Sequence, residues 1–239
     1  FLTRTWKSWV IEARIQYCRF SFLLSYYRLD IKNKIKKFKI NKKLGISITN
    51  PLTTNPKQLH KTMNGLLILA GGKGTRLKNK PFVKFSGIPM LQIIYTELSG
   101  LFDEVAISAR NRENEKEIKK LTNNAKIIYD KCEFKSYNSP LIGIVSAFSE
   151  MKSETVFVVS CDVPLIKKEI AKIILSEIKG FCAAVPRTGN DFLEPLIAAY
   201  DREAMLKAGK SVFSDDKSKL SVREALEELN VNYIPSAKF

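Results

Sequence analysis

The stretch LAGGKGTRLKNKPFVKFSGIP, residues 69–89, is the most informative part of this 239-residue chain for its fold. It follows a short apolar run, residues 66–69, of the kind that forms a buried parallel strand. Gly71, Gly72 and Gly74 then let the backbone turn sharply and bring its N–H groups close to a ligand. Four cations lie in or just after this turn: Lys73, Arg76, Lys78 and Lys80. A glycine-rich turn that leaves a strand among clustered cations predicts a phosphate-binding loop.

Two common phosphate-binding motifs do not fit this loop. The P-loop pattern GxxxxGK[ST] does not occur in the chain. The dinucleotide pattern GxGxxG begins well at Gly72 and Gly74, but Leu77 stands at its third glycine. The structural alternative is a tight strand-to-helix turn with solvated lysines, and the density of cations favours phosphate binding over it.

Strand-like and helix-like segments alternate after this loop. Helical spacing of apolar residues predicts helices over residues 90–101, 113–121, 140–151, 166–178 and 221–229. Strands are predicted over residues 104–108, 126–129, 155–160, 181–186, 194–200 and 231–234. The alternation predicts a three-layer α/β fold, in which helices cover both faces of a mostly parallel central sheet. Ligands of such sheets bind beyond the carboxyl ends of the strands.

Two carboxylates follow predicted strands at that edge. Asp162 is the first carboxylate after the most hydrophobic strand, and Asp130 comes directly after the strand over residues 126–129. A lone carboxylate in the position of Asp162 suits Mg²⁺, which binds through one or two carboxylates together with substrate phosphates. The structural alternatives are an Asx turn that ends the strand at Asp162 and a loop-initiating aspartate at Asp130.

The positive charge is concentrated in the first quarter of the chain. The whole chain carries +16. Residues 1–62 contain 14 basic and 2 acidic side chains, which gives +12; residues 63–239 contain 26 basic and 22 acidic side chains, which gives +4. Met63 is the first methionine and stands directly before the strand that opens the recognisable domain. We therefore divide the chain into a basic N-terminal extension, residues 1–62, and one α/β domain, residues 63–239.

Three interpretations of the extension are open. It is an arm that binds nucleic acid or an anionic membrane, a targeting segment, or translated upstream sequence with Met63 as the true start. Its motif-free composition, rich in Ile, Lys, Asn and Phe, favours the last, and with it an extension that is disordered or foreign to the native protein. No apolar run reaches the ~18 residues of a membrane span, and we expect a cytoplasmic protein.

Several kinds of catalytic and metal site are excluded by residue usage. The single histidine, His60, lies in the extension, so the domain has no histidine-based triad and no histidine-ligated zinc. The four cysteines are not spaced as metal ligands and predict reduced thiols.

The spacing LAGGxGxRLxxKP, residues 69–81, resembles the signature of nucleotidyltransferases that use a nucleoside triphosphate and release pyrophosphate. Within that superfamily the chain looks most like the molybdenum cofactor guanylyltransferases. The run Gly87-Ile88-Pro89-Met90-Leu91 and the match of Cys161-Asp162-Val163-Pro164 to the family pattern CDxP extend the resemblance. It covers Met63 to about Tyr200, and the family's closing NxNTP segment is missing. The resemblance implies a Rossmann-like nucleotidyltransferase fold.

The resemblance also implies roles for individual residues. Those that would bind the nucleotide are Leu69, Ala70, Gly71, Gly72, Gly74, Lys80, Ser108, Asp130 and Asp162. Those that would serve catalysis are Arg76, Lys80 and Asp162, with Asp162 as the Mg²⁺ ligand. This chain departs from the family at Ser139, which replaces the first glycine of a GPLxG segment, and at Ser108, where the family often has Asn. Residues Glu194-Pro195-Leu196 with Tyr200 resemble a segment near the acceptor substrate.

The reaction implied by the resemblance is transfer of GMP from GTP to the terminal phosphate of molybdopterin, with release of pyrophosphate. An anionic phosphate nucleophile needs no strong base, which agrees with a domain that lacks histidine. The nearest alternatives are adenosylcobinamide-phosphate guanylyltransferase and cytidylyl- or sugar-phosphate nucleotidyltransferases. A non-catalytic nucleotide-binding protein and an RNA- or membrane-binding protein that acts through residues 1–62 belong to different classes. We expect no specific nucleic-acid partner; base specificity, the exact acceptor and the oligomeric state stay open.

Overall fold

A computed structural model of the chain describes residues 62–71, 79–131, 139–188, 192–214 and 219–239. Residues 62–238 form one compact unit. Residues 1–61 of the predicted extension lie outside the described residues, as do residues 72–78 of the glycine-rich loop.

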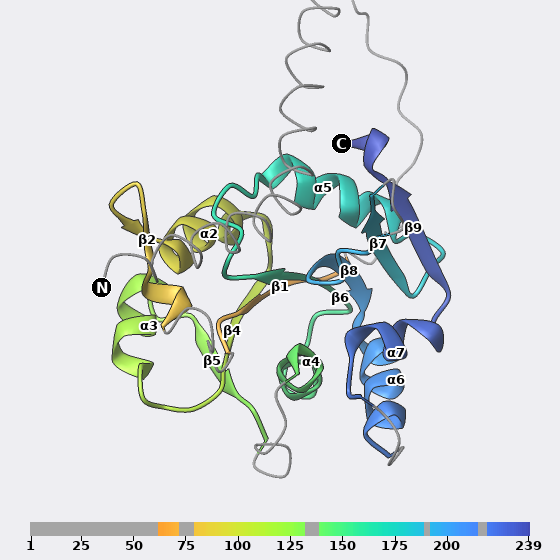
Figure 1. The fold of residues 1–239 in the computed structure, drawn as a ribbon, viewed down its shortest axis with the longest axis horizontal. Helices are drawn as coiled ribbons and strands as arrows, with labels where there is room; N and C mark the ends of the chain where they lie inside the picture. The colour runs from red at the N-terminus through yellow and green to blue at the C-terminus, as the bar shows by residue number, and fades with distance from the viewer. Residues whose placement is uncertain (1–61, 72–78, 132–138, 189–191, 215–218) are drawn as a thin grey trace, which may run out of the picture. The chain divides into compact units, whose positions relative to one another are not determined.

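A seven-stranded sheet forms the centre of this unit (Figure 1), in the order β5-β4-β1-β6-β8-β7-β9. Its strands are β1 (Asn64–Leu69), β4 (Glu104–Ala109), β5 (Lys126–Tyr129), β6 (Thr155–Ser160), β7 (Ala183–Arg187), β8 (Ile197–Asp201) and β9 (Val231–Pro235). The pairings are parallel except the two made by β8, which runs antiparallel between β6 and β7. The predicted α/β class and mostly parallel sheet are confirmed.

Helices form a layer on each face of the sheet. They are α2 (Met90–Leu98), α3 (Glu115–Leu121), α4 (Pro140–Phe148), α5 (Lys168–Glu177), α6 (Arg202–Ser214) and α7 (Val222–Glu227), with short 3-10 turns η1 (Lys80–Phe82), η2 (Ser99–Leu101) and η4 (Ser236–Lys238). Helices α4, α6 and α7 pack side by side on one face, and α2 and α5 lie on the other (Figure 1). The predicted three-layer arrangement is therefore present.

The two most hydrophobic strands lie side by side at the centre. Strands β1 and β6 pair in register, with Leu66 opposite Phe157 and Leu69 opposite Ser160. Their middle residues are buried because each strand has helices on both faces, which explains the continuous apolar runs in the sequence. Helix α4 is buried from Leu141 to Phe148 because it lies between the sheet and α6. The core therefore holds the ends of β1 and β6 in fixed positions.

Two elements were not predicted from the sequence. Helix α6 has charged residues, a central glycine and low overall hydrophobicity, so its helical pattern of apolar residues is weak. It forms because apolar side chains on one face pack into the core: Met205, Leu206, Ala208 and Val212. A hairpin of β2 (Lys84–Phe85) and β3 (Ile88–Pro89) follows η1. Its turn residues Ser86 and Gly87 have positive φ angles of 50° and 86°, which suits a two-residue hairpin turn.

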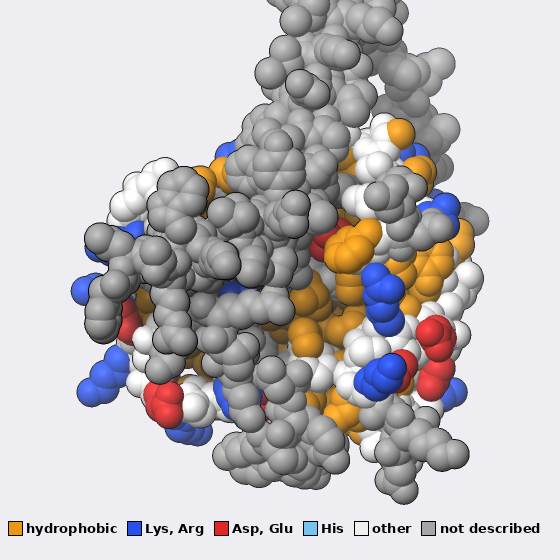
Figure 2. Space-filling model, in the orientation of Figure 1, with side chains coloured by type: hydrophobic (Ala, Val, Ile, Leu, Met, Phe, Trp, Pro, Cys, Tyr) orange, Lys and Arg blue, Asp and Glu red, His pale blue; other side chains and the backbone are white. Residues whose placement is uncertain are grey.

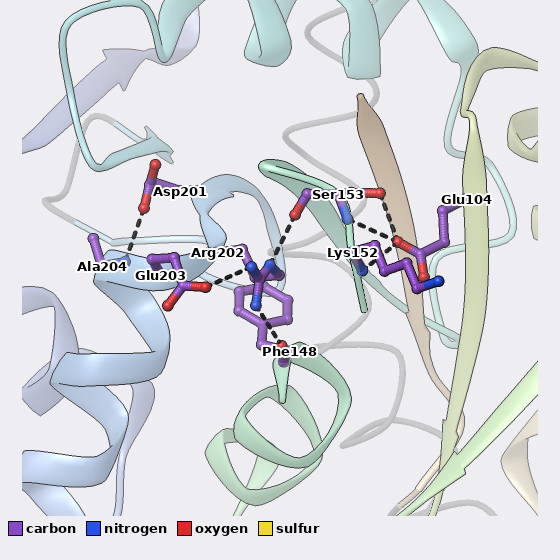
Figure 3. A network of polar contacts seen from close by, with 8 residues as sticks. All are labelled: Glu104, Phe148, Lys152, Ser153, Asp201, Arg202, Glu203 and Ala204. Carbon is purple, nitrogen blue, oxygen red and sulfur yellow. Dashed lines mark hydrogen bonds and ion pairs between the residues drawn. The ribbon is translucent and has the colours of Figure 1, made fainter. Parts of the chain in front are cut away.

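A polar network holds the sheet together at the amino ends of the strands (Figure 3). Glu104 Oε2 accepts hydrogen bonds from Lys152 N and Ser153 N, each at 2.9 Å, and from Ser153 Oγ at 2.7 Å. Arg202 donates through Nε to Ser153 O at 3.0 Å and through a terminal nitrogen to Phe148 O at 3.1 Å. Burial opposes ionisation of Glu104, but these hydrogen bonds outweigh it and lower its pKa. The network joins β4, α6 and the connection from α4 to β6.

Charge on the described part of the surface is mixed in sign. On the face shown in Figure 2, basic and acidic side chains are interspersed around the visible described residues. This agrees with the small net charge of +4 on residues 63–239. No helix within the described ranges is both long and apolar enough to cross a membrane.

Candidate active site

Backbone hydrogen bonds join the first residues after β1, β5 and β6 to the last residues of neighbouring strands. Ala70 N donates to Ser108 O at 2.8 Å, Cys161 N donates to Leu69 O at 3.1 Å, and Asp130 N donates to Ala109 O at 3.1 Å. These bonds extend the parallel ladder past the last residues of β1, β6 and β5. The loops that leave β1, β4, β5 and β6 therefore start from one edge of the sheet, where ligands of such sheets bind.

Lys80 and Asp162 meet at this edge. Asp162 follows β6 by two residues, and Lys80 opens η1 just after the glycine-rich loop. Lys80 Nζ lies 3.1 Å from Asp162 Oδ2, within both hydrogen-bond and ion-pair distance. The Lys80 side chain is 41% exposed and that of Asp162 is 20% exposed. The sequence predicted functional roles for both residues, and the structure brings them into contact.

The backbone around Lys80 is held in place by its own turn. Asn79 adopts the left-handed conformation with φ of 59°, which asparagine tolerates better than most residues. Phe82 N donates to Asn79 O at 2.9 Å, Val83 N donates to Lys80 O at 3.2 Å, and Pro81 is buried. These contacts fix where the Lys80 side chain starts.

Ser160, the last residue of β6, contacts the other oxygen of the same carboxylate. Its Oγ donates a hydrogen bond to Asp162 Oδ1 at 2.6 Å, a distance typical of a hydroxyl bound to a carboxylate. The bond orients the Asp162 side chain relative to the end of the strand. Sequence reasoning missed Ser160; its only signal was a hydroxyl two residues before the aspartate.

Asp130 is placed at the same edge of the sheet, directly after β5, the outer strand beside β4. The residue is partly buried, and its Oδ1 is enclosed with no hydrogen-bond partner among the described residues. Burial raises the pKa of Asp130, and the charge of Arg110 partly opposes this. A buried acceptor at the edge of a ligand site is suited to hydrogen-bond donors of a ligand.

Gly143 on α4 allows the helix to approach this edge closely. A Cβ atom at Gly143 would lie 2.6 Å from Ser108 Oγ and 3.6 Å from Asp130 Oδ1. Ser108 is buried, with 2% of its surface exposed. Its hydroxyl therefore faces α4 in this structure, while its carbonyl oxygen accepts the hydrogen bond from Ala70 that starts the glycine-rich loop.

The start of the glycine-rich loop is described, but its centre is not. Gly71 is exposed, but a Cβ atom there would lie 3.2 Å from the backbone nitrogen of Arg110. This distance is shorter than an ordinary van der Waals contact, and the backbone cannot easily move away. Gly72, Gly74 and Arg76 lie outside the described residues.

The Glu194–Leu196 segment reaches the same edge from β8. Ser160 N donates to Leu196 O at 3.0 Å, which fixes this segment beside the end of β6. Tyr200 is fully buried, and its hydroxyl donates a hydrogen bond to Pro195 O at 2.6 Å. This bond helps to hold the segment in position. Burial raises the Tyr200 pKa strongly, and the side chain stays a neutral donor.

The oxygen ligands at this edge suit a hard cation. Asp162 already accepts an ammonium group at 3.1 Å, so its carboxylate is placed to bind positive charge. Within the residues that the structure describes, no group of three or more His, Cys, Asp or Glu side chains could hold a metal. Asp162 is therefore a residue that could hold a divalent cation together with oxygens of a substrate phosphate.

Comparison with known proteins identifies the family. The profile of the MobA-like NTP transferase domain matches residues 66–230. The chain belongs to this family. The match runs from within β1 to the residue before β9 and includes the Lys80–Asp162 pair. The expected class, a nucleotidyltransferase, is thereby confirmed.

Two relatives of the MobA-like domain carry the name "Probable molybdenum cofactor guanylyltransferase". The protein from Methanocaldococcus jannaschii is 33% identical over 180 residues, which cover 70% of this chain and 84% of the relative. The protein from Thermococcus gammatolerans is 32% identical over 181 residues, which cover 70% of this chain and 84% of the relative. The resemblance seen in the sequence is confirmed at the level of the family.

Solved structures share the fold of this MobA-like domain. Molybdopterin-guanine dinucleotide biosynthesis protein A from Archaeoglobus fulgidus superposes with a TM-score of 0.58 at 24% identity, over 73% of this chain and 84% of that one. A 4-diphosphocytidyl-2C-methyl-D-erythritol synthase from Anaerococcus prevotii also gives 0.58, at 14% identity, over 73% of this chain and 87% of that one. At these identities the likeness shows the fold alone.

Proposed function

We propose that this chain transfers GMP from GTP to the terminal phosphate of molybdopterin and releases pyrophosphate. The relatives named above as molybdenum cofactor guanylyltransferases support the choice of base and acceptor. The observation that carries the proposal is the contact of Lys80 with Asp162 beside the start of the glycine-rich loop. This contact supports the proposal because the scheme requires a cation for phosphate and a carboxylate for the metal close together, where β1 and β6 end.

The chemistry requires little more than alignment and charge neutralisation. An oxygen of the acceptor phosphate attacks the α-phosphorus of GTP and forms the new P–O bond. The bond between the α-phosphorus and the oxygen that bridges to the β-phosphorus breaks, and pyrophosphate leaves with that electron pair. Two anions that repel must be held in line, and negative charge must be balanced as pyrophosphate leaves. No proton has to be removed from the nucleophile, so the domain needs no histidine.

The cations, the glycine-rich loop and Asp162 each have a role in this scheme. The backbone N–H groups of the loop that begins at Gly71 hold the triphosphate, and Arg76 and Lys80 neutralise it. Asp162 holds Mg²⁺, which supplies Lewis acidity and orients the α-phosphate when it is bound. Ser160 keeps the Asp162 carboxylate turned toward the site, as the 2.6 Å hydrogen bond supports.

Asp130 has the chemistry to recognise the guanine nucleotide. Its buried Oδ1 is an acceptor that lacks a hydrogen-bond partner among the described residues. A nucleotide that donates hydrogen bonds to this oxygen relieves the cost of burying it. The Glu194–Leu196 segment, beside the end of β6, is the region that we assign to the acceptor substrate.

The proposal is tested by offering each of the four nucleoside triphosphates with Mg²⁺ and molybdopterin, and measuring pyrophosphate release and the dinucleotide product. GTP should be the substrate used. Preference for CTP, or use of adenosylcobinamide phosphate in place of molybdopterin, would assign the chain to one of the alternative reactions. Mg²⁺ as the metal, a cytoplasmic location and an extension without catalytic function are parts of the same proposal.

A further inference from the structure

We infer that Lys80 is an exchangeable counter-ion of the metal-binding carboxylate. In the nucleotide-free protein its ammonium group occupies Asp162, a divalent cation displaces it, and the released side chain then binds substrate phosphate. This inference rests on the proposed function, because it assumes that Asp162 is the metal ligand.

The two oxygens of Asp162 are held in different ways. Oδ1 accepts a hydrogen bond from Ser160 Oγ at 2.6 Å, and Oδ2 lies 3.1 Å from Lys80 Nζ. A divalent cation on Oδ2 would stand next to the ammonium group, where two positive charges repel strongly in a partly buried site. Binding of the cation therefore requires Lys80 to leave, whereas Ser160 can stay.

Lys80 is free to move in the way that this exchange requires. Its side chain is 41% exposed and ends a flexible four-carbon stem, so it can rotate without disturbing the core. Its backbone is held by the hydrogen bonds of η1 and by buried Pro81. Ser160 lies in the central strand β6 and cannot move far. The exchange is thus confined to one side chain, and the carboxylate keeps its orientation.

The exchange couples metal binding to nucleotide binding. Without nucleotide, the cation must displace Lys80, and the released ammonium group returns to water without a new anionic partner. With nucleotide, the triphosphate takes up the released ammonium group and also supplies oxygen ligands to the cation. Each ligand therefore strengthens the binding of the other. The factor by which nucleotide raises the affinity for the cation equals the factor by which the cation raises the affinity for nucleotide.

The test measures Mn²⁺ binding to nucleotide-free protein by electron paramagnetic resonance, which counts free Mn²⁺ directly. The chains compared are wild type, Lys80→Ala, Lys80→Met, Lys84→Ala and Asp162→Asn. Lys84 lies four residues from Lys80, on the exposed strand β2, and serves as the matched control. Circular dichroism confirms that each variant is folded, and Lys80→Met keeps most of the stem while removing the charge.

Both Lys80 variants should bind Mn²⁺ roughly three- to tenfold more tightly than wild type. In wild type the cation has to break the half-exposed ion pair, and the free energy of that pair lowers the affinity by about this factor. Lys84→Ala should stay within twofold. When GTP is added, the higher Mn²⁺ affinity of the Lys80 variants relative to wild type should disappear or reverse, because the triphosphate in these variants lacks its contact with Lys80.

Mn²⁺ affinity that is unchanged or lower in both Lys80 variants, with binding still lost in Asp162→Asn, would overturn the exchange and leave the metal role of Asp162 intact. Binding that is unchanged in Asp162→Asn would overturn both the exchange and that metal role. The proposed reaction is judged separately, by product formation from GTP and molybdopterin.

Discussion

Lys80 and Asp162 stand 82 positions apart in the chain, yet the Lys80 ammonium nitrogen lies 3.1 Å from Asp162 Oδ2. The contact is possible because β1 and β6 are neighbours in the sheet, with Leu69 opposite Ser160 at their carboxyl ends. The loop after β1 brings the cation and the loop after β6 brings the carboxylate.

Replacement of Asp162 by Asn should lower kcat by roughly 10²–10³-fold, because the shape is kept while the charge that we propose binds the metal is lost. Folding should survive, since Asn can still accept the hydrogen bond from Ser160. Steady-state pyrophosphate release with GTP and Mg²⁺ measures the loss, and Glu117→Gln on the exposed face of α3 is the control. Near-normal Mg²⁺-dependent turnover in Asp162→Asn would show that the metal is held elsewhere.

Replacement of Lys80 by Ala should reduce kcat/KM for GTP by roughly 10- to 150-fold. The estimate takes ~1.5–3 kcal/mol for a charge-assisted contact to phosphate and ~1.4 kcal/mol for each factor of ten. Lys78→Ala, two residues earlier, should be nearly silent. Equal losses in both variants would mean that the loop attracts phosphate only through its general positive field, and the specific role of Lys80 would be wrong.

Replacement of Asp130 by Asn should stabilise the ligand-free protein at neutral pH and weaken its use of GTP. Burial raises the pKa of Asp130 in the folded state, so its ionisation destabilises the fold by an amount that grows as the pH rises above the unfolded pKa and is complete above the raised pKa. The stability gain should be present at pH 7 and should shrink toward zero as the pH falls to about 4, the ordinary aspartate pKa. Urea unfolding across this range measures it, alongside KM for GTP. A variant that is less stable than wild type at pH 7 would contradict this account of Asp130.

Replacement of Glu104 by Gln should cost about 1 kcal/mol of stability without changing KM for GTP, because the network lies at the opposite end of the sheet from the site. The pKa of Glu104 is lowered in the folded state, so its contribution is complete above the unfolded value of about 4.3 and is lost as the pH falls through the lowered pKa. The stability difference between variant and wild type should therefore vanish in acid. A difference that persists unchanged at pH 3, or a raised KM, would argue against a purely structural role.

A protein that starts at Met63 should fold and turn over like the full chain. The recognisable motifs all lie after Met63, and residues 62–238 form one compact unit. Circular dichroism and kcat/KM for GTP compare the two proteins at equal ionic strength. A folded but inactive truncation would show that residues 1–62 contribute to the site.

The sequence was most informative where a single segment determines its own structure. The apolar runs of β1 and β6 predicted buried parallel strands because both faces of each strand are covered. Asp162 follows β6 by two residues, and Lys80 ends the loop that leaves β1, so both were expected at the carboxyl edge. That much of the site follows from local patterns together with the general rule for ligand binding in parallel sheets.

Features that depend on contacts between distant segments could not be predicted in this way. Helix α6 has a weak periodic pattern and forms through its packing on α4 and α7. The antiparallel direction of β8 is set by its pairing with β6 and β7. The hydrogen bond from Ser160 to Asp162 and the close approach of Gly143 to Ser108 are likewise matters of three-dimensional fit.

The central claim is that this chain is a guanylyltransferase whose acceptor is molybdopterin, and one measurement tests it most directly. Purified protein is incubated with Mg²⁺, molybdopterin and each of the four nucleoside triphosphates in turn, and the dinucleotide product is quantified by mass spectrometry with pyrophosphate as the co-product. The account predicts one equivalent of pyrophosphate for each molybdopterin guanine dinucleotide formed, with GTP used far better than CTP, ATP or UTP. Absence of that dinucleotide with GTP, from protein shown to be folded, would contradict the account.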